Sequence, residues 1–108
     1  MNVVIIALLL IEINPSIKVL QILDSVESSI EAFRNGLDAD LLFVDIHLSD
    51  GNSFEIFTAI TNSIPLVFTT AFDNYAIQAF KQNSIDYLLK PITEKDLQFA
   101  LEAFKRHQ

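Results

Sequence analysis

Three short apolar runs, each ending in a polar residue, constrain the fold of this chain more than any other feature. They are Leu41–Asp45, Leu66–Thr70 and Tyr87–Lys90, and they end in a carboxylate, a hydroxyl and an ammonium group. An apolar run of this length, bounded by turn residues, is typical of a strand buried on both faces of a parallel sheet. Open α/β sheets bind ligands at the carboxyl ends of their strands. The sequence therefore predicts that these three groups meet at one edge of a sheet.

Strand and helix patterns alternate along the chain, which predicts right-handed βαβ units and a parallel sheet. The expected strands are Val3–Ile6, Ile17–Leu23, Leu41–Asp45, Leu66–Thr70 and Asp86–Leu89.

Helical spacing of apolar residues predicts helices between these strands. Asp24 and Glu27 have the spacing of a capping box that opens one helix, and Gly36 is expected to end it. Thr93 to Asp96 is expected to open the last helix. The apolar stripes are Val26, Ile30 and Phe33; Ile56, Phe57 and Ile60; Ala76, Ala79 and Phe80; and Leu97, Ala100, Leu101 and Phe104.

Composition limits the class of protein. A chain of 108 residues predicts a single domain with a real core, and a formal net charge of −7 argues against nucleic-acid binding by this segment. The absence of cysteine excludes disulfides and suits a reducing cytoplasm. The longest apolar stretch, Val3 to Ile11, is too short to span a bilayer and lacks the features of a signal peptide. Two glycines in all leave no glycine-rich phosphate loop, which argues against a flavodoxin-like small-ligand binder.

The first crossover is too short. Residues Ala7 to Ser16 lie between the first two expected strands, whereas a parallel crossover needs about a dozen residues or more. Either the first strand pairs unusually or residues are missing after Ile6. We favour missing residues, and we expect a break between Ile6 and a helix at Leu8–Ile13.

Three segments together resemble one family. They are Asp45–Gly51, Phe68–Asp73 and Ser84–Pro91. In this order and spacing they are similar to the receiver domain of two-component response regulators, the CheY-like fold, and within it to the branch that carries a LytTR DNA-binding domain. The resemblance implies a doubly wound five-stranded parallel sheet of order 2-1-3-4-5. It also implies a phosphorylation switch rather than an enzyme, with at most self-phosphorylation and self-dephosphorylation activity.

The resemblance also implies roles for individual residues. Asp45 would be the phosphoacceptor, Thr70 the switch hydroxyl and Lys90 the ammonium that contacts the phosphoryl group. Tyr87 would be the switch aromatic, and the bond before Pro91 would be cis.

Each of these residues also has a structural interpretation. Asp45 has the character of a turn former and Lys90 that of a solvated charge at a strand end. Thr70 would satisfy loop backbone groups, and Tyr87 would belong to the core. Phe72 would either flank the phosphoryl group or pack under the next helix.

The resemblance implies Mg²⁺ as a cofactor, held by Asp45, by the backbone carbonyl of His47 and by an acidic pair directly after the first strand. Here Ile6 is followed by Ala7 and Leu8. A single lost segment would explain both the short crossover and the absent acids. If the acids are truly absent, the alternative is a receiver-like interaction module that is not phosphorylated.

The partners implied by the resemblance are a histidine kinase and a C-terminal output domain that binds DNA and regulates transcription in the cytoplasm. A homodimer would form through the fourth helix, fifth strand and fifth helix of the family, with Tyr75, Phe80 and Phe104 as candidate surface residues. Aromatic residues at helical spacing, here Phe54, Phe57, Phe99 and Phe104, are usually core residues, so only some of the three candidates are expected on the surface.

Overall fold

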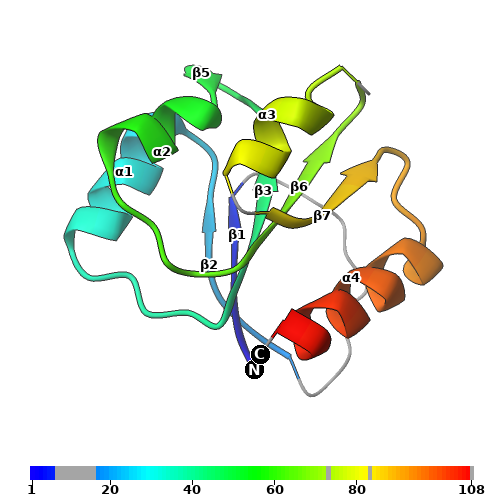
Figure 1. Cartoon of the computed structure of the whole chain (residues 1–108). Coiled ribbons are helices and arrows are strands. Elements are labelled where there is room, and N and C mark those ends of the chain that lie inside the picture. Colours follow the sequence, from blue (N-terminus) through cyan, green and yellow to red (C-terminus); the bar gives the residue numbers. More distant parts are fainter. Residues whose placement is uncertain (7–16, 73, 83, 108) are drawn as a thin grey trace.

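The computed structural model describes residues 1–6, 17–72, 74–82 and 84–107 (Figure 1). Its centre is a five-stranded parallel sheet with the strand order β2-β1-β3-β6-β7. The predicted α/β fold and strand order are confirmed. The strands are β1 (Asn2–Ile6), β2 (Lys18–Leu23), β3 (Leu41–Asp45), β6 (Leu66–Thr70) and β7 (Ser84–Leu89).

Helices cover both faces of this sheet. They are α1 (Val26–Arg34), α2 (Phe54–Ala59), α3 (Ala76–Lys81) and α4 (Glu94–His107). Alternate residues of β1 enter two separate cores: Val4 and Ile6 pack with α1, α2 and α3, whereas Val3 and Ile5 pack with α4. A strand buried on both faces needs apolar residues at every position, which explains the unbroken apolar runs.

A small hairpin follows β3 directly, and the sequence analysis did not anticipate it. The strands β4 (His47–Leu48) and β5 (Gly51–Asn52) form a two-residue antiparallel ladder. The hairpin carries Asp50 toward the start of α1.

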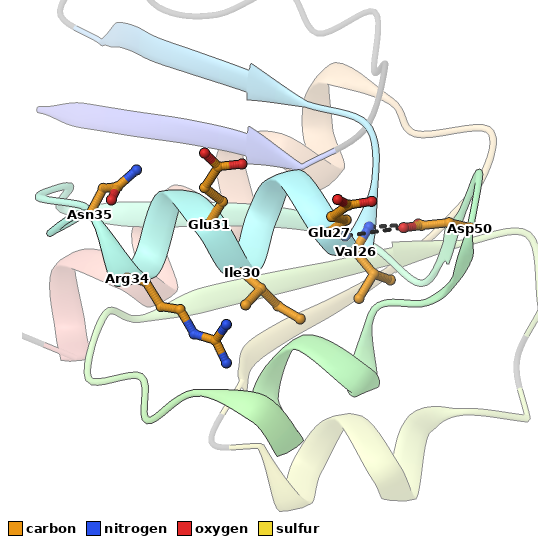
Figure 2. Close-up of a pocket in the computed structure, with 7 residues that line it drawn as sticks. All are labelled: Val26, Glu27, Ile30, Glu31, Arg34, Asn35 and Asp50. Atoms are coloured by element: carbon orange, nitrogen blue, oxygen red, sulfur yellow. Dashed lines mark hydrogen bonds between the residues drawn. The ribbon is translucent and has the colours of Figure 1, made fainter.

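The start of α1 differs from the prediction. Ser25 caps the helix by accepting a hydrogen bond from the Ser28 N–H, so the expected box of Asp24 with Glu27 is wrong. The carboxylate of Asp50 accepts from the N–H groups of Val26 at 2.6 Å and Glu27 at 3.1 Å (Figure 2). Those two hydrogen bonds lower the pKa of Asp50 below its ordinary value. A carboxylate from a distant hairpin therefore satisfies N–H groups that a helix start leaves unpaired.

The start of α4 agrees with the prediction. The Thr93 hydroxyl accepts from the Asp96 N–H at 3.1 Å, and the Thr93 N–H donates to the Asp96 carboxylate at 3.0 Å. These two bonds form a reciprocal capping box, here with an aspartate in the acidic position.

One expected core aromatic lies on the surface instead, and one candidate surface aromatic is confirmed there. Phe99 is 54% exposed on the outer side of α4, with the ammonium of Lys95 5.8 Å from its ring centroid, and Phe80 is 80% exposed on α3. The placement of Phe99 in the core was therefore wrong. Phe104 is only 3% exposed and belongs to the α4 core, so it is not a surface residue.

The strands β1 and β2 pair in parallel from Asn2 opposite Lys18 to Ile6 opposite Leu23. The break expected after Ile6 and the helix expected at Leu8–Ile13 lie outside the described residues, so both stay predictions. In the part of the chain that is described, no helix has the length and apolar character needed to cross a membrane.

The Asp50 clamp predicts a pH-dependent effect on stability. Because the folded-state pKa of Asp50 is depressed, its contribution is present above the ordinary carboxyl pKa and lost as pH falls through the folded value. Asp50→Ala should lower the urea midpoint at neutral pH, and the gap to wild type should narrow in acid. Asp38→Ala is the matched control, because no described backbone N–H donates to that carboxylate. A gap that stays constant from neutral to acidic pH would contradict the clamp.

Candidate functional site

Asp45 lies at the carboxyl end of β3 and is only 6% exposed. One carboxylate oxygen accepts from the ammonium of Lys90 at 2.5 Å, and the other accepts from the N–H of His47 at 3.3 Å. The structure therefore brings together the acid and the amine that the strand-end pattern placed at one edge. Burying a carboxylate costs free energy unless it is paired, and Lys90 supplies that partner.

The end of β7 is fixed beside the end of β6. The Lys90 N–H donates to the carbonyl of Thr70 at 2.7 Å, and the Lys90–Pro91 peptide bond is cis, as expected. The Lys90 side chain reaches Asp45 across the intervening strand β6. Its side chain is about one-third exposed, so it is accessible from solvent.

Thr70 is fully buried at the end of β6, next to β3 in the sheet. Its hydroxyl oxygen accepts from the N–H of Phe72 at 3.2 Å. Thr70 therefore satisfies a backbone N–H of the following loop, as its structural interpretation predicts. A hydroxyl that accepts a hydrogen bond still carries a proton to donate, so Thr70 retains a donor for a ligand at Asp45.

Tyr87 connects β7 to the same loop. Its hydroxyl donates to the carbonyl of Phe72 at 2.5 Å, while its partly buried ring packs against the core on the α1–α3 side. The backbone of Phe72 is thus held at both ends, by Thr70 through its N–H and by Tyr87 through its carbonyl. Tyr87 is more than a core residue.

An aromatic cluster beside the site was not predicted. The ring of His47 makes edge-on contacts with Phe72 at 5.2 Å and Tyr75 at 5.4 Å between centroids. Phe72 packs against His47 and is 53% exposed, so it flanks the site and does not lie buried under α3. One signal was available, since His47 and Phe72 each stand two positions after the polar end of neighbouring strands.

The described residues alone do not fit a Mg²⁺ site. Nowhere in the described part of the chain do three His, Cys, Asp or Glu side chains gather into a possible metal-binding group. The oxygens of Asp45 contact the ammonium of Lys90 and the N–H of His47. The positions expected to carry the acidic pair, directly after Ile6, lie outside the described residues.

A separate hollow of about 580 Å³ runs along α1 (Figure 2). None of the residues at the Asp45 edge lines it. Its lining residues are Val26, Glu27, Ile30, Glu31, Arg34, Asn35 and Asp50.

The sequence profile described as response regulator receiver domain matches residues 3–102. The chain belongs to this family. Its relatives include the sensory transduction protein LytT of Bacillus anthracis, 35% identical, with 92% of this chain and 41% of that protein covered. Another is the LytT of Enterococcus faecalis, 42% identical, with 70% of this chain and 34% of that protein covered. The receiver domain spans about two fifths of the length of such relatives, whose names agree with the LytTR branch.

Solved structures share the fold of this receiver domain at lower identity. The response regulatory domain of protein mrkE from Klebsiella pneumoniae superposes with a TM-score of 0.79 at 21% identity, covering 99% of this chain and 97% of that one. The response regulator domain of Thermotoga maritima CheB gives 0.72 at 18% identity, covering 98% and 92%. At these identities the similarity shows the fold alone.

The double attachment of Phe72 predicts a stability effect for one hydroxyl. Tyr87→Phe removes the donor to the Phe72 carbonyl and should lower the free energy of unfolding by about 1 kcal/mol in urea titrations. Tyr75→Phe is the control, because it removes a hydroxyl for which the described residues supply no hydrogen-bond partner. Equal losses in the two variants would show that the Tyr87 bond contributes nothing specific.

Proposed function

We propose that this receiver domain is a phosphorylation-dependent switch and that Asp45 accepts the phosphoryl group of a histidine kinase. The observation that carries the proposal is the contact between the Asp45 carboxylate and the Lys90 ammonium, with Thr70 on the strand between them. A buried acid beside a partly exposed amine is a plausible nucleophile whose negative charge is already offset.

The reaction forms one bond and breaks another. A carboxylate oxygen of Asp45 bonds to phosphorus, and the bond from phosphorus to the donor's imidazole nitrogen breaks, leaving the electron pair on the donor. Acceptor and phosphoryl group are both negative. Lys90 lies where an ammonium would reduce their repulsion, because its nitrogen already contacts the acceptor oxygen.

The response would pass through Phe72. The Thr70 hydroxyl donates a hydrogen bond to a phosphoryl oxygen, and Thr70 moves toward Asp45. Because Phe72 is hydrogen-bonded to Thr70 by its N–H and to Tyr87 by its carbonyl, the displacement reaches the Tyr87 ring. A local charge event thereby alters the surface around β7.

The output function of the proposed switch belongs to a separate domain. In this proposal a DNA-binding domain follows the receiver domain, and the protein regulates transcription in the cytoplasm. Self-association of the activated form would use the face of α3, β7 and α4. Exposed apolar side chains on these three elements support this role: Ile77, Phe80, Leu89 and Phe99.

One observation favours a second candidate, a receiver-like interaction module that is not phosphorylated. Among the described residues, no His, Cys, Asp or Glu side chains gather into a metal-binding group. In that case the ion pair of Asp45 with Lys90 is permanent and holds the strand ends together.

Intact mass after incubation with acetyl phosphate separates the two candidates. With Mg²⁺ we expect one phosphoryl adduct per chain, lost in Asp45→Asn and retained in the matched variant Asp40→Asn. Replacing Mg²⁺ with EDTA should abolish the adduct. No adduct under either condition supports the silent module, and an adduct that persists in Asp45→Asn refutes the assignment of the acceptor.

Substitutions of Lys90 test separately whether its positive charge promotes phosphoryl transfer to Asp45. Lys90→Ala should slow adduct formation by roughly 10- to 100-fold, because one charged donor to the developing phosphoryl charge is lost. Lys90→Arg should not restore the rate, since the planar guanidinium is bulkier than a point ammonium. Lys95→Ala, on α4, should leave the rate unchanged. Wild-type rates in both Lys90 variants would remove Lys90 from the site.

A further inference from the structure

A second threonine at the end of β6, Thr69, carries a hydroxyl that the site described above does not use. Its side chain is fully buried, and its oxygen has no hydrogen-bond partner among the described residues. The hydroxyl of the neighbouring Thr70, in contrast, accepts from the N–H of Phe72. Because a buried hydroxyl without a partner costs free energy, such a group in a folded protein calls for an explanation.

Strand pairing puts Thr69 beside Asp45 on one face of the sheet. Thr69 of β6 pairs directly with Asp45 of β3, and directly paired residues of parallel strands point to the same face. Two residues earlier, Phe43 pairs with Val67, and both belong to the core that α4 covers. Because side chains alternate between faces along a strand, Asp45 and Thr69 point to that same face.

The strand that carries Thr69 also lies between the two partners of the ion pair. On its other side, Thr69 pairs with Leu88 of β7, which belongs to the α4 core as well. Lys90 follows two residues later, and its ammonium reaches Asp45 across β6. Thr69 is therefore flanked by the acceptor on one side and by the strand end that carries the ammonium on the other.

A hydroxyl at this position can hold Asp45 without neutralising its charge. Threonine has one proton to donate, and each carboxylate oxygen accepts more than one hydrogen bond. In the proposed reaction the ammonium of Lys90 turns from Asp45 toward the phosphoryl oxygens. That movement removes a charged donor from a carboxylate that is almost fully buried, and a buried charge needs hydrogen bonds.

We propose that Thr69 is a reserve hydrogen-bond donor to Asp45, engaged when Lys90 turns toward the phosphoryl group. It is a positioning residue, because it keeps the carboxylate in place while the nucleophilic oxygen attacks phosphorus. Its part in phosphoryl transfer rests on the proposed function. The hydrogen bond itself can be tested in the unphosphorylated chain.

Removal of Lys90 should reveal this hydrogen bond in urea titrations. With Lys90 present, Thr69→Val replaces an unpaired buried hydroxyl by a methyl group and should keep or raise the urea midpoint. In the Lys90→Ala background the same substitution should lower the midpoint, because the buried carboxylate of Asp45 then depends on the hydroxyl. Thr69→Ser keeps the hydroxyl and should shift the midpoint equally in both backgrounds.

Ser53 provides a matched control for this experiment. Its hydroxyl is also buried and has no described partner, and it lies at the start of α2. Ser53→Ala should shift the midpoint by the same amount with and without Lys90, because the effects of independent sites add. An equal shift for Thr69→Val in the two backgrounds overturns the reserve donor.

The acetyl phosphate assay tests the part of Thr69 in phosphoryl transfer. At saturating acetyl phosphate, Thr69→Val should slow adduct formation about five- to tenfold and leave the half-saturating concentration unchanged, since a misplaced nucleophile affects the chemical step. Thr69→Ser should retain most of the wild-type rate. A wild-type rate in Thr69→Val overturns the positioning role and leaves Asp45 as the acceptor. Absence of an adduct in the wild-type chain overturns the proposed function itself, together with the part of Thr69 in it.

Discussion

The ion pair between Asp45 and Lys90 is the interaction on which the rest of the site depends. A parallel sheet brings the carboxyl ends of its strands to one edge, so residues far apart in sequence meet there without any dedicated loop. The carboxylate of Asp45 is almost fully buried, and an unpaired charge at that position would cost several kcal/mol. Lys90 offsets that cost from two strands away, and its backbone is in turn held by Thr70.

Around this pair, the loop after β6 is constrained at one residue. The N–H of Phe72 donates to the Thr70 hydroxyl and its carbonyl accepts from the Tyr87 hydroxyl, while its ring packs edge-on against His47. A loop fixed in this way has few independent motions. Displacement of Thr70 and reorientation of Tyr87 are therefore expected to occur together, and the aromatic ring of His47 shares that environment.

Much of this arrangement could be predicted from sequence, because local patterns encode it. Alternating strand and helix patterns indicated the five strands, and the polar residues at the ends of Leu41–Asp45, Leu66–Thr70 and Tyr87–Lys90 indicated which edge of the sheet brings them together. The predictions that were wrong concern contacts between distant residues or the face of a helix that points to solvent. Ser25, next to the expected Asp24, caps α1, and Asp50 adds hydrogen bonds to the same helix start from more than twenty residues away. Phe99 has helical spacing with the core residues yet lies on the outer face of α4. The contact of His47 with Phe72 exists only once β3 and β6 are neighbours.

The clamp of Asp50 on α1 has a consequence for cooperativity. The hairpin that follows Asp45 supplies hydrogen-bond acceptors to the first amides of α1, and Ser49 donates to the Asp24 carbonyl just before that helix. Amide protons at the first turn of a helix ordinarily exchange with solvent quickly, since they have no partner inside the helix. Because the amides of Val26 and Glu27 donate to Asp50, we expect them to exchange only when the hairpin detaches from the helix. We therefore expect the β4–β5 hairpin and α1 to open together, so that hydrogen exchange at the start of the helix reports the state of the hairpin beside Asp45.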